Sequence, residues 1–584
     1  MRRFARSLSP ASAAALLFFM MTSPLTSRAA LGAGYDRPAG DPQASRSAVT
    51  AVHGMVATSQ PLATQAGLRV LEQGGNALDA AIAANAVLGV VEPMSCGIGG
   101  DLFCIYWDNA QQKLYGLNAS GRSPYALTAQ EFARRGLAQV PDEGALSWSV
   151  PGCVDGWETL RAKLGTLPLA DLLAPAIAHA ETGFAVSEII AADWRASTEA
   201  LSQHPDTAKT YLPGGRAPSK GELFKNPRLA ATLRAIAAGG RDAFYKGPIA
   251  AQIVAFSRRS GGFFESRDFA EHASTWVEPV STNYRGYDIY ELPPPCQGIA
   301  ALQMLNLLEP YDLRALGHNT AELLHLAVEA KRLAYADRAR YYADPEFAKI
   351  PVDWLISKEY AAQRGKLIDR QRAALAVAPG DAPLVAGDTV YLCAVDKDRN
   401  CCSLIQSNYY GFGSQLVPGD LGFALQNRGA LFSLAAEHPN RYEPHKRPFH
   451  TIIPGFAAKD GKPWLVFGVM GGDMQPQGHV QALINLIDFG MDPQQAGDAA
   501  RWRHFGSATP TGLVADPEGS AVIVESGISD EAVHGLRERG HVVLKGDPRT
   551  RGAYGGYQAI QIDHEHGTLI GGSDPRKDGA ASGY

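Results

Sequence analysis

Residues 387–395, Gly-Asp-Thr-Val-Tyr-Leu-Cys-Ala-Val, mark a change of character along this chain. The residues before them, 371–388, are rich in Ala, Pro and Gly and lack periodicity, which is typical of a loop. Residues 390–395 are β-branched or apolar and predict a strand. Thr389 therefore stands where a loop meets the first strand of a C-terminal part.

The residue type at this junction has a specific chemical use. A Thr hydroxyl is a weak nucleophile unless the Thr begins a chain, where its own α-amine can take the hydroxyl proton. Thr389 could reach that state if its hydroxyl attacked the carbonyl of Asp388 and water then opened the resulting ester. A Thr at the start of a strand is, however, far more often structural. The local sequence leaves both interpretations open.

The surrounding pattern predicts an α+β protein with stacked sheets covered by helices. Further strands are expected at 102–107, 402–407, 464–469, 542–544 and 558–563. Helices are expected within 61–90 and 160–260, from about 299, and at 320–342, 478–486, 493–501 and 530–539.

Size and charge narrow the class of protein. The chain has 584 residues, which predicts two or more domains or one large layered unit. Hydrophobic residues make up 46% and charged residues 19%, the balance of a soluble globular protein. The net charge of −5, without a basic run beyond the extreme N-terminus, argues against a nucleic-acid partner.

The N-terminus predicts export to the periplasm or beyond. Three Arg lie among the first six residues, and residues 13–21 form an apolar run too short to span a bilayer. Small residues near Ala29 predict a signal peptide over 1–29; an uncut membrane anchor is the alternative. No later segment is apolar enough for a membrane helix, so the mature form is expected to have no span.

A set of ordered motifs covers roughly residues 50–584. They are GMVATSQP (54–61), QGGNALDAA (73–81), GIGGD (97–101), SVPG (149–152), PPP (293–295), GDT (387–389), KRP (446–448), GG (471–472) and GSDPR (572–576). In these motifs the sequence resembles the γ-glutamyltransferase family. The resemblance implies a four-layer αββα N-terminal-nucleophile hydrolase that cleaves itself between Asp388 and Thr389. The expected products are a large subunit, 30–388, and a small subunit, 389–584, with a dimer of such heterodimers as a further expectation.

The catalytic positions of the family can be carried over one at a time. Ser407 stands 18 residues after Thr389, where the family has a Thr whose hydroxyl supports the nucleophile. Gly471 and Gly472 match the oxyanion glycines, whose backbone N–H groups each contribute about 2.7–4 kcal/mol to such reactions. From the residues alone, a Gly-Gly pair after a strand would be interpreted as an ordinary turn.

The substrate positions depart from the family's pattern. Leu431 stands where typical members have the acidic residue that holds the glutamyl amino group, and Arg428 is its charged neighbour. Tyr409 replaces an Asn that helps to hold the substrate. Arg428 and Leu431 favour an anionic or apolar acyl group over a zwitterionic one. A solvated surface position is the alternative for Arg428.

Three more positions complete the expected substrate site. His450 and Thr451 replace a Ser-Ser pair, although His450 could equally be a structural histidine. The Arg that clamps the substrate carboxylate in the family aligns with Ser120, and Arg122 follows two residues later. The segment between Phe432 and Lys446 also looks too short for the lid loop of several members, which favours water over an amino acid as acceptor.

These departures look like the divergent, acylase-like or oxamate-amidohydrolase-like branch of the family. We expect hydrolysis of γ-glutamyl or related amides through an acyl-Thr389 intermediate. The alternatives are an acylase or small-amide hydrolase, oxamate-like or glutaryl-type, without γ-glutamyl specificity, a processed but inactive binding protein, and a secreted structural protein. No metal or organic cofactor is implied, because the nucleophile, the base and the oxyanion donors are all protein groups.

Overall fold

The structure, a computed structural model, describes residues 44–374, 388–512, 520–546 and 553–584. The predicted signal peptide and residues 375–387 of the predicted loop lie outside the described residues. Contacts divide the chain into Met1–Arg46 and a compact unit, Ser47–Tyr584, which contains every element below.

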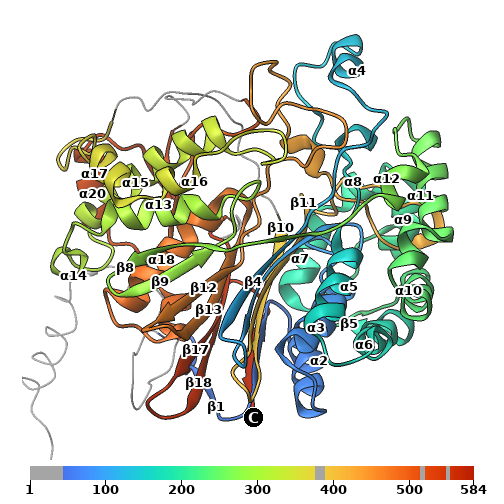
Figure 1. The fold of residues 1–584 in the computed structure, drawn as a ribbon, viewed down its shortest axis with the longest axis horizontal. Coiled ribbons are helices and arrows are strands. Elements are labelled where there is room, and N and C mark those ends of the chain that lie inside the picture. The colour runs from blue at the N-terminus through green and yellow to red at the C-terminus, as the bar shows by residue number, and fades with distance from the viewer. Residues whose placement is uncertain (1–43, 375–387, 513–519, 547–552) are drawn as a thin grey trace, which may run out of the picture. The chain divides into compact units, whose positions relative to one another are not determined.

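Two seven-stranded antiparallel sheets form the centre of this unit (Figure 1). The first sheet has the order β19 (Ala580–Gly583), β2 (Met55–Thr58), β10 (Asp388–Val395), β11 (Cys401–Tyr409), β3 (Asp101–Asp108), β4 (Lys113–Ala119) and β7 (Thr275–Val277). The second has the order β1 (Val49–Ala51), β18 (Thr568–Ser573), β17 (Gly556–Asp563), β13 (Lys462–Met470), β12 (Gly455–Lys459), β9 (Tyr287–Glu291) and β8 (Val280–Tyr284).

The alternation of side chains along β10 explains why both of its faces are covered. Successive residues of a strand point to opposite faces. Tyr391, Cys393 and Val395 belong to a core shared with the second sheet. The residues between them, such as Leu392, belong to a core shared with helices. A Cβ on Gly468 of β13 would lie 2.5 Å from the Tyr391 ring, so the missing side chain makes room for that ring between the sheets.

Helices pack against the outer face of each sheet (Figure 1). Helices α2 (Pro61–Glu72) and α3 (Ala77–Val91) share a core with the first sheet. Helices α13 (Gly298–Leu308), α15 (Ala321–Tyr341) and α18 (Gln475–Ile487) share a core with the second. The protein is therefore a mixed α/β protein built on antiparallel sheets.

The remaining elements surround these layers. They are α4 (Ala129–Arg134), α5 (Cys153–Leu164), α6 (Leu169–Thr182), α7 (Glu188–Ala196), α8 (Thr198–Ser202), α9 (Pro205–Tyr211), α10 (Pro227–Tyr245), α11 (Pro248–Arg259), α12 (Ser266–Ala270), α14 (Leu313–Leu316), α16 (Val352–Leu355), α17 (Lys358–Gly365), α19 (Pro493–Asp498), α20 (Asp530–Glu538), a two-stranded sheet of β5 (Phe184–Ala185) and β6 (Leu223–Phe224), and a three-stranded sheet of β14 (Trp502–His504), β15 (Val522–Val524) and β16 (Val543–Lys545).

The predicted strands and helices are confirmed, with one boundary corrected. The helix expected over 493–501 ends at Asp498, because Ala499 leaves the helical conformation and Trp502 begins β14. All seven cysteines are buried and free, including adjacent Cys401 and Cys402. Within the described ranges, none of the helices combines the length and the apolar character needed to cross a bilayer.

Candidate active site around Thr389

A bulge between β10 and β11 brings the predicted nucleophile to its partner. Asp388 pairs with Tyr409, but Val390 pairs with Gln406, so the β11 strand has one extra residue opposite Thr389. The Thr389 Oγ1 hydroxyl donates a hydrogen bond to Ser407 Oγ over 3.2 Å. The backbone N–H of Tyr409 donates to the same oxygen over 2.8 Å. Ser407 therefore accepts from both sides of the bulge and orients the Thr389 hydroxyl.

Tyr409 holds an unusual backbone conformation directly beside the Thr389 hydroxyl. Its φ is +83°, a value that few residues other than glycine adopt, and such strain concentrates at functional sites. Its ring stacks on Tyr410 with 4.1 Å between centroids. Tyr409 and Tyr410 both line a pocket.

Gly471 and Gly472 follow β13, which ends at Met470, and lead into α18 through a single 3-10 turn. Their φ angles are +131° and +59°. A Cβ on Gly471 would lie 3.0 Å from the Cα of Gly555, so space as well as conformation requires glycine there. Backbone N–H groups at the start of a helix favour negative charge. Gln297 fixes this turn, since its amide donates to the carbonyls of Gly472 (2.9 Å) and Thr451 (2.6 Å).

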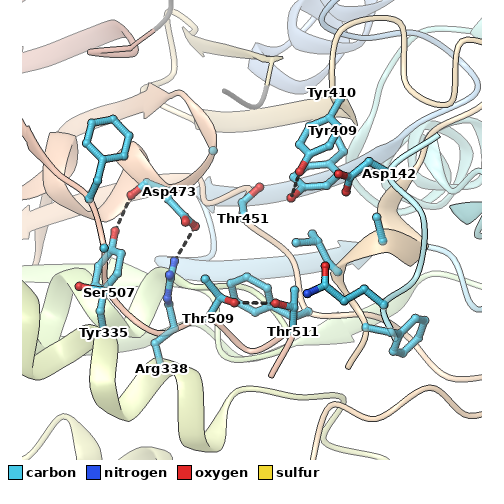
Figure 2. Close-up of a pocket in the computed structure, with 18 of the residues that line it drawn as sticks. Asp142, Tyr335, Arg338, Tyr409, Tyr410, Thr451, Asp473, Ser507, Thr509 and Thr511 are labelled. Atoms are coloured by element: carbon cyan, nitrogen blue, oxygen red, sulfur yellow. Dashed lines mark hydrogen bonds and ion pairs between the residues drawn. The ribbon is translucent and has the colours of Figure 1, made fainter. Parts of the chain in front are cut away.

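A pocket of about 120 Å³ lies between the Gly472 turn and the end of β11 at Tyr409 (Figure 2). Of the predicted site residues, Tyr409, Thr451 and Gly472 line it. The others lining it are Gln139, Val140, Asp142, Lys331, Tyr335, Arg338, Tyr410, Ala430, Leu431, Phe432, Phe449, Asp473, Arg503, His504, Phe505, Gly506, Ser507, Thr509 and Thr511. Thr389 itself is 1% exposed and lies behind Tyr409 in this uncut chain.

Arg428 is fully buried, so it is not a solvated surface residue. Its Nη1 donates to Thr451 Oγ1 over 2.7 Å, and its guanidinium lies 4.8 Å from the centroid of the Tyr409 ring. Its Nε and Nη2 make no hydrogen bond within the described part of the chain. Burial lowers the Arg428 pKa to about 10, although nearby Asp101 acts in the opposite direction. A buried cation with unused donors thus contacts two residues that line the pocket.

His450 is buried behind the pocket and does not line it. Its Nε2 lies 2.7 Å from Asp101 Oδ2, and its Nδ1 lies 2.8 Å from the carbonyl of Pro448. Burial lowers the His450 pKa, while the hydrogen bond to Asp101 opposes that shift. The His450 ring therefore connects the turn after α3 to the segment that carries Thr451.

The structure does not bring Arg122 or Ser120 to the pocket. The Arg122 guanidinium pairs with Glu346 over 2.8 Å. Ser120 is fully buried and its hydroxyl donates to Asn118 over 2.6 Å. The side chain of Arg447 lies beside this segment, because its Nε donates to the Ser120 carbonyl over 3.2 Å.

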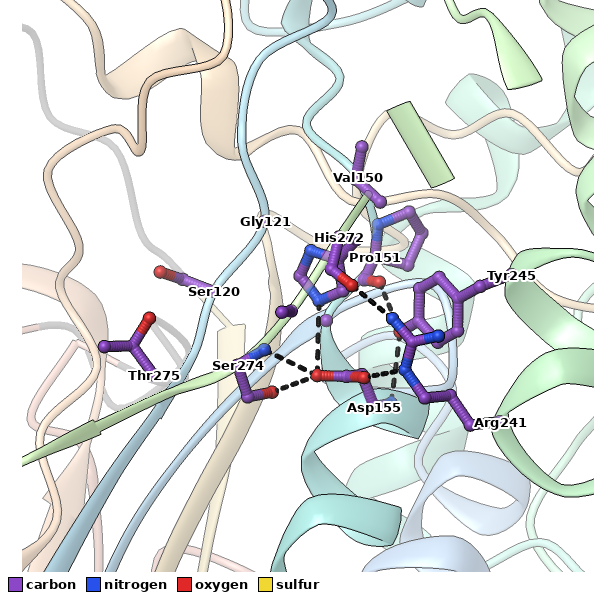
Figure 3. Close-up of polar contacts among 12 residues, drawn as sticks. Ser120, Gly121, Val150, Pro151, Asp155, Arg241, Tyr245, His272, Ser274 and Thr275 are labelled. Carbon is purple, nitrogen blue, oxygen red and sulfur yellow. Dashed lines mark hydrogen bonds and ion pairs between the residues drawn. The ribbon is translucent and has the colours of Figure 1, made fainter. Parts of the chain in front are cut away.

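Figure 3 shows Ser120 together with a buried polar network around Asp155. At its centre, Asp155 of α5 pairs with Arg241 of α10 and accepts from the Ser274 backbone (2.6 Å) and hydroxyl (2.5 Å). His272 stacks on Tyr245 with 5.2 Å between ring centroids, and burial lowers the His272 pKa to about 4. The network joins two helices to the segment before β7, which is a structural task.

The charged residues of the pocket were not predicted from the sequence. Lys331 and Arg338 of α15 line it, together with Arg503 and His504 of β14 and Asp473. A signal for two of them exists in the sequence. Leu324, Val328, Lys331, Tyr335 and Arg338 follow the spacing of one helix face, so two cations occupy positions on an apolar stripe.

Among the residues that the structure describes, one group of side chains could hold a metal ion, and it lies outside the pocket. His325 and Glu329 of α15 and His541 bring their ligand atoms within 4.8 Å of one another, and all three are buried. His325 Nδ1 and His541 Nε2 lie 2.8 Å apart, and His325 Nε2 lies 2.7 Å from the carbonyl of Asp369. None of the three lines the pocket, so the chemistry at Thr389 does not draw on them.

Comparison with known proteins relates the chain to one family. The pattern of the family described as Gamma-glutamyltranspeptidase matches residues 63–584. The glutathione hydrolase-like YwrD proenzyme of Bacillus subtilis is 40% identical over 531 residues, which are 91% of this chain and 98% of the relative. The oxamate amidohydrolase proenzyme of Klebsiella pneumoniae is 33% identical over 543 residues, 91% of this chain and 98% of the relative.

A solved structure is similarly close. The crystal structure of cephalosporin acylase from Bacillus halodurans superposes with a TM-score of 0.85 at 41% sequence identity, covering 94% of this chain and 99% of that chain. Its match extends over both seven-stranded sheets, since it covers nearly the whole chain. The chain is therefore an enzyme that belongs to the gamma-glutamyltranspeptidase family of N-terminal-nucleophile hydrolases.

Proposed function

We propose that this protein is a self-cleaving amidohydrolase that uses Thr389 as its nucleophile. The observation that carries this proposal is the hydrogen bond from Thr389 Oγ1 to Ser407 Oγ, 3.2 Å long, beside a pocket lined by Gly472. We propose that the two sheets and their covering helices form the four-layer αββα arrangement expected for the family; the helices that share a core with each sheet support this. The products are a large subunit, 30–388 after export, and a small subunit, 389–584.

The first reaction frees the Thr389 amine. Thr389 Oγ1 attacks the carbonyl carbon of Asp388, the C–N bond breaks, and the Asp388 acyl group moves onto the hydroxyl oxygen as an ester. Water then hydrolyses the ester, which leaves a carboxylate on Asp388 and an amine on Thr389. Asp388 pairs with Tyr409 in the uncut chain, so its release uncovers Thr389 on the side of the Tyr409 ring.

The second reaction hydrolyses the substrate. The Thr389 amine takes the hydroxyl proton, Oγ1 attacks the substrate carbonyl, and the proton passes to the departing amine. The oxyanion of each tetrahedral intermediate would be stabilised by the backbone N–H groups at Gly471 and Gly472. Water then hydrolyses the acyl-Thr389 ester and restores the free hydroxyl. We expect water rather than an amino acid as acceptor, because the segment 432–446 is short.

The substrate is proposed to be a small amide that carries a carboxylate. Leu431 offers no charge to an ammonium group, whereas Arg428, buried against Tyr409 and Thr451, favours an anion. Relatives named as an oxamate amidohydrolase and as a cephalosporin acylase support this class. Hydrolysis of γ-glutamyl compounds is the second candidate, supported by the relative named as glutathione hydrolase-like.

A panel of amides tests this function directly. Purified, self-cleaved protein is incubated with γ-glutamyl, glutaryl and oxamate amides, and release of the amine is measured. Thr389→Ala is the control, because it keeps the fold and removes the nucleophile. We expect turnover of a carboxylated amide by the wild type alone. A wild type that cleaves itself but releases no amine from any member would instead support an inactive binding protein.

A further inference from the structure

We propose that Lys331 and Arg503 form a binding site for a carboxylate that the substrate carries in addition to its scissile amide. The inference rests on the proposed function only in taking the pocket as the substrate site. It adds two specificity-determining residues on the wall of the pocket built by α15 and β14.

Lys331 is a buried lysine whose Nζ has no carboxylate within 4.0 Å in the described part of the chain; burial lowers the Lys331 pKa well below its usual range, although Asp473 acts in the opposite direction. Lys331 is 1% exposed. Its Nζ lies 2.8 Å from Ser507 Oγ, 3.1 Å from His504 Nδ1 and 4.0 Å from the centroid of the Tyr335 ring. All of these neighbours are neutral or weakly polar, and an ammonium group has three donors, of which two are placed. Burying a charge without a partner is costly unless a ligand supplies that partner.

Arg503 offers a second cation on the same wall. It is 3% exposed, and its Nη1 donates to the carbonyl of Ala553 over 3.0 Å. Its guanidinium lies 4.4 Å from the centroid of the Phe505 ring, and its Nε makes no hydrogen bond within the described ranges. No carboxylate of the described residues forms an ion pair with it.

The acids of the pocket do not balance these charges. Asp473 pairs with Arg338 over 2.7 Å, and Arg503 and Lys331 also lower its pKa, so this one carboxylate faces three basic side chains. The only other acid of the described lining, Asp142, lies beside Tyr409 and Tyr410, away from Arg338 and Asp473 (Figure 2). An anionic ligand would therefore restore the charge balance at the Lys331 end.

The arrangement fits a carboxylate in particular. Lys331 and the Ser507 hydroxyl lie 2.8 Å apart, so one carboxylate could accept from both. His504 Nδ1 lies 3.1 Å from Lys331 Nζ, and its Nε2 lies 3.1 Å from Ser520 Oγ. Burial lowers the His504 pKa, so the imidazole is neutral and its Nδ1 can accept from Lys331. The substrate class that follows is a monoamide of a dicarboxylic acid, or an amide with an acidic leaving group.

The test compares a charged ligand with a neutral ligand that has the same carbon chain. Binding of glutarate and of its neutral diamide, glutaramide, is measured by titration calorimetry on the full protein. The first variant is Lys331→Met, which has an uncharged side chain of similar length. The second is Arg503→Met, which tests the same preference for the charged ligand if Lys331→Met folds poorly. Arg340→Gln removes a charge from an exposed position of the same helix and is the matched control.

We expect the wild type and Arg340→Gln to prefer glutarate over glutaramide. The preference should fall by roughly 10-fold or more in Lys331→Met and in Arg503→Met, the usual worth of a charge-assisted hydrogen bond. Equal binding of the two ligands by the wild type, or an unchanged preference in both folded Met variants, would overturn the inference. Because binding is read without turnover, a protein that binds glutarate but hydrolyses nothing contradicts the proposed function and not this site.

Discussion

Thr389 and Ser407 face each other across a bulge, with 3.2 Å between their hydroxyl oxygens, and the Thr389 hydroxyl donates. The second hydrogen bond to Ser407 Oγ comes from the backbone of Tyr409, which lines the pocket. One serine thus connects the proposed nucleophile to the wall of the proposed substrate site.

Replacing Ser407 should slow both reactions of Thr389. Ser407→Ala removes an acceptor of two hydrogen bonds, which predicts a loss of roughly 5- to 100-fold in rate. Ser407→Thr keeps the hydroxyl and should cleave itself at nearly the wild-type rate. The appearance of the two product chains is followed by gel over time. A Ser407→Ala protein that cleaves as fast as the wild type would remove Ser407 from the mechanism.

Substitution of Gly471 should abolish most of the activity through geometry. A Cβ there would meet the Gly555 backbone at 3.0 Å, so the N–H groups of the turn would shift from the oxyanion position. We expect Gly471→Ala to lower kcat roughly 100-fold or more. Gly461→Ala is the control, because Gly461 has a φ of +73° with open space around it, in the turn between β12 and β13. Equal activity of the two variants would contradict the oxyanion assignment.

Replacement by Met should change the KM at Arg428 but not at Arg122. Arg428 contacts Tyr409 and Thr451 at the pocket, whereas Arg122 is held by Glu346 outside it. We expect Arg428→Met to raise KM for a carboxylated amide by about 10-fold or more, the worth of a hydrogen bond to a charged group. Self-cleavage should continue in both variants, and Arg122→Met should keep the wild-type KM. A raised KM in Arg122→Met, together with an unchanged KM in Arg428→Met, would show that Arg122 binds the substrate carboxylate.

Acid should lower the free energy of unfolding, because His272 takes up a proton when the chain unfolds. The unfolded chain takes up a proton at this residue near pH 6.5, whereas burial lowers the folded-state pKa to about 4. Between these values the unfolded state binds more protons, so the free energy of unfolding falls as the pH falls. His541, whose pKa burial lowers to about 3, acts in the same direction. Denaturant midpoints measured through this range should fall less steeply for His272→Phe, whose ring can still stack on Tyr245. An identical slope would exclude His272 as a cause.

The fold was predictable where periodicity is strong. The β-branched and apolar run 390–395 predicts a strand, and the structure places its two sets of side chains in two different cores. The end of α19 was missed by three residues, because the pairing of Trp502 with Val524 depends on a distant segment. The sheet register at Asp388 likewise depends on a bulge that has no local signal.

The candidate site was predictable only in part. The motifs located Thr389, Ser407, Tyr409, Thr451 and the glycines, which the structure brings together. Local sequence could not decide whether Arg428 is solvated, and the structure buries it completely. Lys331 and Arg338 resemble surface residues of a helix until their places on its apolar stripe are counted, and Arg503 belongs to a short strand from another part of the chain.

The central claim is that Thr389 becomes an N-terminus. Wild-type protein and Thr389→Ala are purified, incubated and analysed by denaturing gel and by mass spectrometry of the smaller product. We predict two chains from the wild type, the smaller one beginning at Thr389 and ending at Tyr584, and one uncut chain from Thr389→Ala. A wild type that stays a single chain, or a small product that begins at another residue, would contradict the account.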